Sequence, residues 1–203
     1  DAPHARIPTP YVATPTLQQQ IATPDKQNAT FVARLALPLS DDHPDHAALL
    51  VADYLLGGGG TSRLWMRIRE TEGLSYDVRT RTAWGTLDEN SIWQASAIFA
   101  PQNRAKVEAA FREELAKALR QGFTAAELAE GQRALLNFRR LARAQDDRLA
   151  MTLAQNVYLG RTMARAAQVD AAIEKLTLAQ VNEALRRHID PARAAVVFAG
   201  DFR

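Results

Sequence analysis

The 203-residue sequence contains no cysteine. It can therefore form neither a disulfide framework nor a thiolate metal site, and it is compatible with an oxidising or a reducing compartment. It also lacks any run of 18 or more apolar residues, so we expect no membrane-spanning helix. The chain does not begin with Met, and its first residues show no charged segment followed by an apolar stretch. We therefore expect any targeting signal to lie outside this sequence.

A strong excess of charge of one sign is also missing. The formal net charge is +2, with 25 Lys and Arg against 23 Asp and Glu. The densest basic run, Arg133 to Arg148, alternates with apolar residues at helical spacing, which is typical of a solvated helix face and does not indicate a nucleic-acid partner. The composition, 47% hydrophobic and 24% charged, is that of an ordinary globular protein.

Complete metal-binding motifs are absent. The sequence contains neither His-x-x-Glu-His nor His-Glu-x-x-His, and the chain has only four histidines. Of these, only His43 and His46 have a spacing that would bring two ligands to one metal. A third ligand at a suitable spacing is missing, so we interpret His43 and His46 as a surface pair and expect no metal in this chain.

Two further catalytic or binding motifs are incomplete. No Gly-x-Ser-x-Gly is present, so Ser62 and Ser75 are interpreted as a helix cap and a strand residue. The four glycines from Gly57 to Gly60 are not followed by the lysine of a phosphate-binding loop. They favour a close-packed turn between two helices, and the alternative, a nucleotide-binding domain, would require a bound anion at this turn.

The patterns that the sequence does contain predict one domain, residues 16–203. Residues 1–15 contain four prolines and are interpreted as an extended lead-in or interdomain linker. Alternating apolar residues predict strands at 16–23 and 29–39, joined as a hairpin or lying side by side. A second hairpin is predicted from 74–84 and 90–100, and a buried closing strand at 194–199.

Helical periodicity fills the rest of the chain. One helix is predicted from the caps Ser40 or Asp41 to Gly57, and a second from the caps Thr61 or Ser62 to Gly73, which should adopt a left-handed conformation. Further helices are predicted at 101–122, 124–142, 146–159, 165–174 and 178–187. These elements together predict an α+β domain of two layers, with helices on one face of a largely antiparallel sheet.

One segment is more specific than the rest. Residues 53–78 read Asp-Tyr-Leu-Leu-Gly-Gly-Gly-Gly-Thr-Ser-Arg-Leu-Trp-Met-Arg-Ile-Arg-Glu-Thr-Glu-Gly-Leu-Ser-Tyr-Asp-Val. The segment resembles the zinc-free half-domain of pitrilysin/insulinase-type metallopeptidases, the inverted zincins. The resemblance extends over about residues 16–203.

The resemblance implies a half of a zinc-dependent endopeptidase that is inactive alone. In this family a homologous half, on the same polypeptide or a separate subunit, carries the zinc. The zinc-free half lends an arginine and a tyrosine to the cleft, where they contact the peptide and stabilise the oxyanion. Here these residues would be Arg69 and Tyr76, and the cleft would also include Gly57 to Gly60 and Ser75. The strand at 74–84 would offer an edge to an extended peptide.

Other interpretations stay open at this point. Arg69 could pair with a surface carboxylate such as Glu72, leaving Tyr76 as a half-buried strand residue. Members of the same superfamily also serve as structural assembly subunits without peptidase activity. The compartment is not fixed by the sequence, and the resemblance to exported bacterial relatives favours the periplasm.

Overall fold

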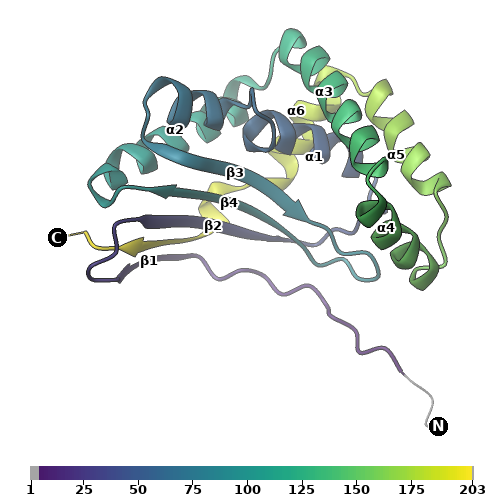
Figure 1. Cartoon of the computed structure of the whole chain (residues 1–203), viewed down its shortest axis with the longest axis horizontal. Coiled ribbons are helices and arrows are strands. Elements are labelled where there is room, and N and C mark those ends of the chain that lie inside the picture. Colours follow the sequence, from purple (N-terminus) through teal and green to yellow (C-terminus); the bar gives the residue numbers. More distant parts are fainter. Residues whose placement is uncertain (1–4, 203) are drawn as a thin grey trace.

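The computed structural model describes residues 5–202 and shows an α+β domain of two layers (Figure 1). The lower layer in that view is a five-stranded sheet with the order β1-β5-β2-β4-β3, and the helices lie over one of its faces. All strand pairs are antiparallel except β1 with β5. The predicted fold class is therefore confirmed. The strands are β1 (Leu17–Ala22), β2 (Ala29–Leu37), β3 (Ser75–Ala83), β4 (Ser91–Phe99) and β5 (Ala195–Gly200).

The helical elements follow the predicted order. Two of them are π-helices, η1 (Tyr54–Gly58) and η2 (Trp65–Thr71), and two are short 3₁₀ turns, η3 (Pro101–Asn103) and η4 (Pro191–Arg193). The α-helices are α1 (His46–Asp53), α2 (Arg104–Gln121), α3 (Ala125–Arg143), α4 (Asp146–Tyr158), α5 (Ala164–Lys175) and α6 (Leu178–His188).

Strand β2 forms the centre of the core. Its side chains alternate, so that Phe31, Leu35 and Leu37 are buried while Arg34 is exposed. The buried side faces the helices, and the Phe31 ring lies 4.8 Å from that of Phe111 on α2. This alternation is the signal by which the sequence predicts the strand.

The predicted pairing of the first two strands is wrong. β1 is not a neighbour of β2, because β5 lies between them and pairs with both. The apolar β5 buries Val196 and Phe198 and is stabilised by a neighbour on each side. β1, with the sequence Leu-Gln-Gln-Gln-Ile-Ala, is exposed along its whole length, which suits an edge position.

The first predicted helix departs from the prediction at both ends. It begins at His46 with Asp45 as its N-cap residue, so neither Ser40 nor Asp41 caps it. The helix expected to run to Gly57 is α-helical only to Asp53 and then continues as the π-helix η1 to Gly58. The capping box at Thr124 and Glu127 is formed as predicted: the Thr124 hydroxyl accepts from the Glu127 N–H, and the Glu127 carboxylate accepts from the Thr124 N–H.

The lead-in contains no helix or strand over residues 5–15. It nevertheless contacts the domain at the connection between β3 and β4 and at strand β2. The Arg6 guanidinium donates to both oxygens of Asp88, at 2.5 and 2.9 Å, and the Thr14 hydroxyl accepts from the Ala36 N–H. The rest of the predicted lead-in, residues 1–4, lies outside the described residues. No helix in the part of the chain that the structure describes is long and apolar enough to cross a membrane.

Asp53 is an unusual residue at the end of α1. Its Oδ1 atom is buried and makes no hydrogen bond within residues 5–202. Burial raises the pKa of Asp53 to about 6, although hydrogen bonds from Thr80, Trp93 and Thr82 oppose this shift. The fold therefore favours the protonated carboxyl group.

We predict that Asp53 lowers the stability of the protein at neutral pH. Because the pKa of Asp53 in the folded protein lies above its ordinary value of 3.8, the stability that Asp53 contributes is fully present below pH 3.8 and is lost as the pH rises through about 6. Asp53→Asn should therefore gain stability relative to wild type between pH 4 and 7, by on the order of 2 to 3 kcal/mol. Urea unfolding at several pH values measures this, and a difference that does not change with pH would contradict it.

Candidate functional site

The glycine run forms a tight turn against the sheet. A Cβ atom at Gly57 would lie 2.6 Å from the Thr80 backbone nitrogen on β3, and one at Gly59 would lie 2.7 Å from the Tyr54 ring. No side chain larger than hydrogen fits at Gly57, and one at Gly59 would require the Tyr54 ring to move. Gly60 has open space around it, so its glycine is not required by packing. The close-packed turn between two helices is thus confirmed at Gly57 and Gly59.

The second helix begins and ends near the predicted residues. Ser62 stands at its start, where its carbonyl accepts from the Met66 N–H at 2.9 Å. The predicted side-chain cap is not formed, because the Ser62 hydroxyl is buried without a hydrogen-bond partner in the described chain. At the other end Gly73 has φ +61, and the Leu74 N–H reaches back to the Ile68 carbonyl. The left-handed glycine is confirmed.

Two of the three arginines near η2 are hydrogen-bonded to carboxylates. Arg63 donates to both oxygens of Glu127, at 2.6 and 2.9 Å, and its hydrogen bonds lower the pKa of Glu127 to about 2. Arg67 donates to Glu72, Glu113 and Glu114, and these contacts raise the pKa of Arg67. Both guanidinium groups therefore fasten the helix to α2 and α3 and are committed to that role.

Arg69 is placed differently. Its guanidinium lies 4.1 Å above the Trp65 ring, and its Nε is 3.7 Å from the carboxylate of Glu70. The side chain is 42% exposed. The alternative pairing of Arg69 with a surface carboxylate is present, but the partner is Glu70 and not Glu72, which binds Arg67. Arg69 is thus a partly exposed cation that is held by the Trp65 ring and by a long ion pair with the neighbouring Glu70.

Tyr76 occupies a β-bulge at the start of β3. The register shifts between Ser75, which pairs with Phe99, and Asp77, which pairs with Ile98, so Tyr76 is the extra residue. Such a bulge redirects a side chain, and the Tyr76 ring is 57% exposed. The alternative of a half-buried tyrosine does not describe this position.

Ser75 supports the bulge from inside the domain. Its hydroxyl donates to the Ile98 carbonyl at 2.7 Å and lies 2.9 Å from the Asp77 carbonyl, while it accepts from the Asp77 N–H at 3.2 Å. Ser75 itself is buried. Its assignment to a substrate cleft stays a prediction, but the structure gives it a clear part in holding the backbone around Tyr76.

The chain reversal brings Arg69 and Tyr76 to one edge of the domain. η2 packs on β3, and β3 is the edge strand of the sheet. No hydrogen bond or ion pair joins the two side chains among residues 5–202, so both can contact another molecule. The predicted convergence of the pair on a substrate remains a prediction.

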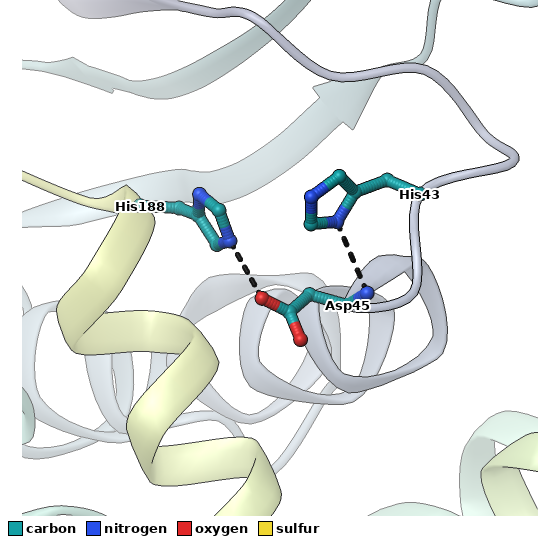
Figure 2. A group of neighbouring side chains, drawn as sticks. All are labelled: His43, Asp45 and His188. Carbon is teal, nitrogen blue, oxygen red and sulfur yellow. Dashed lines mark hydrogen bonds and ion pairs between the residues drawn. The ribbon is translucent and has the colours of Figure 1, made fainter.

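The histidines are distributed in a way that the sequence does not predict. The surface pair of His43 and His46 is not formed: His46 packs edge-on against Trp84 at 4.5 Å, and burial lowers the pKa of His46 to about 4. His43 instead faces His188, from the end of α6, with the ring centres 5.3 Å apart (Figure 2). Asp45 lies between them. The contact between His43 and His188 joins residues about 145 positions apart, so no local sequence pattern predicts it.

Comparison with solved structures shows the same fold in several bacterial proteins. A peptidase M16 inactive domain from Pseudomonas fluorescens matches with a TM-score of 0.79 and 21% identity, over 94% of this chain and 45% of that one. A protease from Helicobacter pylori matches with 0.80 and 16% identity, over 98% and 48%. The periplasmic protease PqqL from Escherichia coli matches with 0.70 and 18% identity, over 92% and 21%.

These likenesses establish the fold, and the chain spans less than half the length of each of the three proteins. No curated protein matches the sequence. The sequence model described as the peptidase M16 inactive domain matches residues 1–135, which include the glycine turn, η2 and the bulge of β3. The chain therefore belongs to the peptidase M16 inactive-domain family.

Proposed function

We propose that this chain is the substrate-contacting, zinc-free half of a zinc endopeptidase, in which Arg69 and Tyr76 bind the peptide backbone and stabilise the oxyanion. One observation carries the proposal. Of the arginines near η2, Arg63 and Arg67 are hydrogen-bonded to carboxylates, while Arg69 makes only a 3.7 Å ion pair with Glu70 and stays 42% exposed on the same edge as the exposed Tyr76. An exposed cation and an exposed phenol on one edge are suited to recognising a carbonyl group.

The two side chains would act together on the scissile carbonyl. The Arg69 guanidinium can donate from its fixed position over Trp65, and the neutral Tyr76 hydroxyl can donate a second hydrogen bond. Negative charge develops on the carbonyl oxygen in the transition state. A well-placed donor to this oxygen is worth roughly 3 to 4 kcal/mol of transition-state stabilisation.

The edge strand β3 supports binding of an extended peptide. Its outer side has no neighbouring strand in the sheet. A peptide that adds to such an edge gains main-chain hydrogen bonds along its length. Tyr76 near the start of β3 would then lie beside the added peptide.

The residues of this chain do not build the zinc site of the family. The sequence holds no His-x-x-Glu-His, and α1, the helix aligned with the zinc helix, carries only His46, which is buried against Trp84. We propose that zinc and the catalytic base belong to a homologous partner half, covalently joined or separate. This chain alone is then inactive, and its contribution is limited to binding and to the two donors.

An exposed apolar surface on α3 and α4 supports the presence of a partner half. α4 has no buried residue. An apolar surface of this kind marks a contact with another protein or domain. The matched proteins from Pseudomonas fluorescens and Helicobacter pylori are more than twice as long as this chain, so a comparable length of chain accompanies the domain in those two proteins. The exposed residues are Phe138, Leu141, Met151, Leu153, Val157 and Tyr158.

The periplasm is our proposed compartment. It is supported by the fold shared with PqqL, which is described as a periplasmic protease. Fractionation of cells that express the full-length protein tests this, and recovery in the cytoplasmic fraction would reject it.

We predict that Arg69→Ala or Tyr76→Phe lowers the peptidase rate by about a hundredfold, because each removes one donor to the oxyanion. The measurement is cleavage of a quenched fluorescent peptide by the chain reconstituted with its zinc-binding half. Arg112→Ala is the matched control, since Arg112 forms an exposed pair with Glu108 on α2, away from the proposed contact with the partner half.

The outcomes separate the proposed function from its alternative. A lower rate with unchanged zinc content and an unchanged control supports the role in the transition state. A reconstituted protein that binds zinc and peptide but never cuts would leave a structural assembly subunit as the explanation. Variants that cut at the wild-type rate would show that this half is only a scaffold in an active enzyme.

A separate prediction concerns Ser75. Ser75→Ala removes the hydroxyl that bonds across the bulge, so the Tyr76 backbone should lose its fixed position. We expect a lower kcat with a smaller effect than Tyr76→Phe, and a loss of stability of about 1 to 3 kcal/mol from the unpaired Asp77 N–H. Ser75→Thr, which keeps a hydroxyl, should restore part of the rate. If Ser75→Ala unfolds more easily but cuts at the wild-type rate, the serine has only a structural role.

A further inference from the structure

His43, Asp45 and His188 form a cluster at the junction of two helices. His43 precedes α1, Asp45 is the N-cap residue of α1, and His188 is the last residue of α6 (Figure 2). One ligand atom from each residue lies within 4.8 Å of the others. His188 Nε2 is 2.7 Å from Asp45 Oδ2. This is the one group of three candidate ligands found among the described residues.

The spacing suits a single metal ion after a small closure. Zinc bonds to imidazole nitrogen and carboxylate oxygen are about 2.0 to 2.2 Å long, so tetrahedral ligand atoms lie roughly 3.3 Å apart. The present separations exceed this by about 1.5 Å at most, a distance that side-chain rotation covers. Two imidazoles and a carboxylate are also ligands that zinc and other borderline divalent ions accept.

The orientation of Asp45 is a second and independent observation. An aspartate at an N-cap ordinarily accepts a hydrogen bond from the first turn of its own helix. Asp45 makes no such bond, and its carboxylate is turned to His188 and Arg187 instead. Both of these contacts are made by Oδ2, which leaves Oδ1 for a further ligand within the part of the chain described. The Asp45 carboxylate therefore points toward the other residues of the cluster and does not cap α1.

The burial of the cluster favours a bound ion. The side chains of His188 and Asp45 are 12% and 19% exposed, so solvent reaches them but screens them little. The two carrier helices, α1 and α6, are packed together. Ligands on rigid, packed elements are held close to one another without further ordering of the chain.

Two features of the metal-free state compete with binding. Arg187 donates to Asp45 Oδ2 at 2.7 Å, but its side chain is 59% exposed and free to move into solvent. The Asp45 N–H donates to His43 Nδ1 at 3.1 Å, which leaves the proton of a neutral ring on Nε2. Binding through Nδ1 replaces this contact, and binding through Nε2 requires the other tautomer.

We propose that His43, Asp45 and His188 bind a divalent transition-metal ion such as zinc, with water completing the coordination, and that the ion clasps the start of α1 to the end of α6. This site lies on the zinc-free half itself. It differs from the catalytic zinc site of the partner half, and its test does not depend on peptide cleavage.

The test is metal binding to this chain in a His4→Ala background, which removes the histidine outside the described residues. Calorimetry with Zn²⁺ should give one site, and Co²⁺ should give visible absorption bands. His43→Ala and His188→Ala should weaken binding by more than the roughly 10- to 100-fold that loss of an outer-shell partner costs. They should also abolish the rise in melting temperature on adding Zn²⁺. His46→Gln is the matched control and should bind as the parent does.

Arg187→Met tests the same site in the opposite direction. It removes the cation that competes for Asp45, so Zn²⁺ should bind several-fold more tightly. If a histidine variant fails to fold, the result for Arg187→Met decides. The proposal is overturned if the parent binds no Zn²⁺ at ~1 mM, a concentration that detects even weak sites. It is also overturned if both histidine variants bind like the control, or if Arg187→Met leaves the affinity unchanged or lower.

Discussion

The close approach of η1 to strand β3 at Gly57 is the constraint on which the site depends. Any side chain at Gly57 would collide with the Thr80 backbone, so only glycine lets the helix end lie directly on the sheet. This contact fixes where the chain turns and where η2 starts. η2 then packs on β3, and Gly73 reverses the chain into that strand. The positions of Arg69 and Tyr76 therefore depend on the contact at Gly57 and on the chain reversal at Gly73.

The arginines around η2 have two different roles: Arg63 and Arg67 hold the structure together, and Arg69 can contact a ligand. Arg67 joins three carboxylates, one of them the buried Glu114, and Arg63 ties the same segment to the capping box of α3 through Glu127. Breaking a partly buried network of this kind leaves carboxylates without partners, which is costly. The helix is therefore held rigidly by two of its cations, and this rigidity is what allows Arg69 to present its donors from a fixed position.

The sequence predicts those features that depend on local pattern. Alternation in β2, the capping box at Thr124 and the left-handed Gly73 all follow from short-range chemistry and are present in the structure. Arg69 and Tyr76 were selected by resemblance, and the structure adds a physical reason in the exposure of the pair. Features that depend on distant contacts were not predictable: the insertion of β5 beside β1, and the meeting of His43 with His188. Each joins segments more than 140 residues apart.

The departures from regular structure are concentrated where the family motif lies. Between residues 53 and 78 the chain holds a buried aspartate, two π-helices, a serine hydroxyl without a partner and a β-bulge. Burial raises the pKa of this aspartate, Asp53, to about 6, so its charged form is disfavoured there. Helices α3 and α6, by contrast, begin with complete capping boxes. Local rules are broken in natural proteins mainly where function requires it, so this distribution itself favours a working site over a scaffold segment.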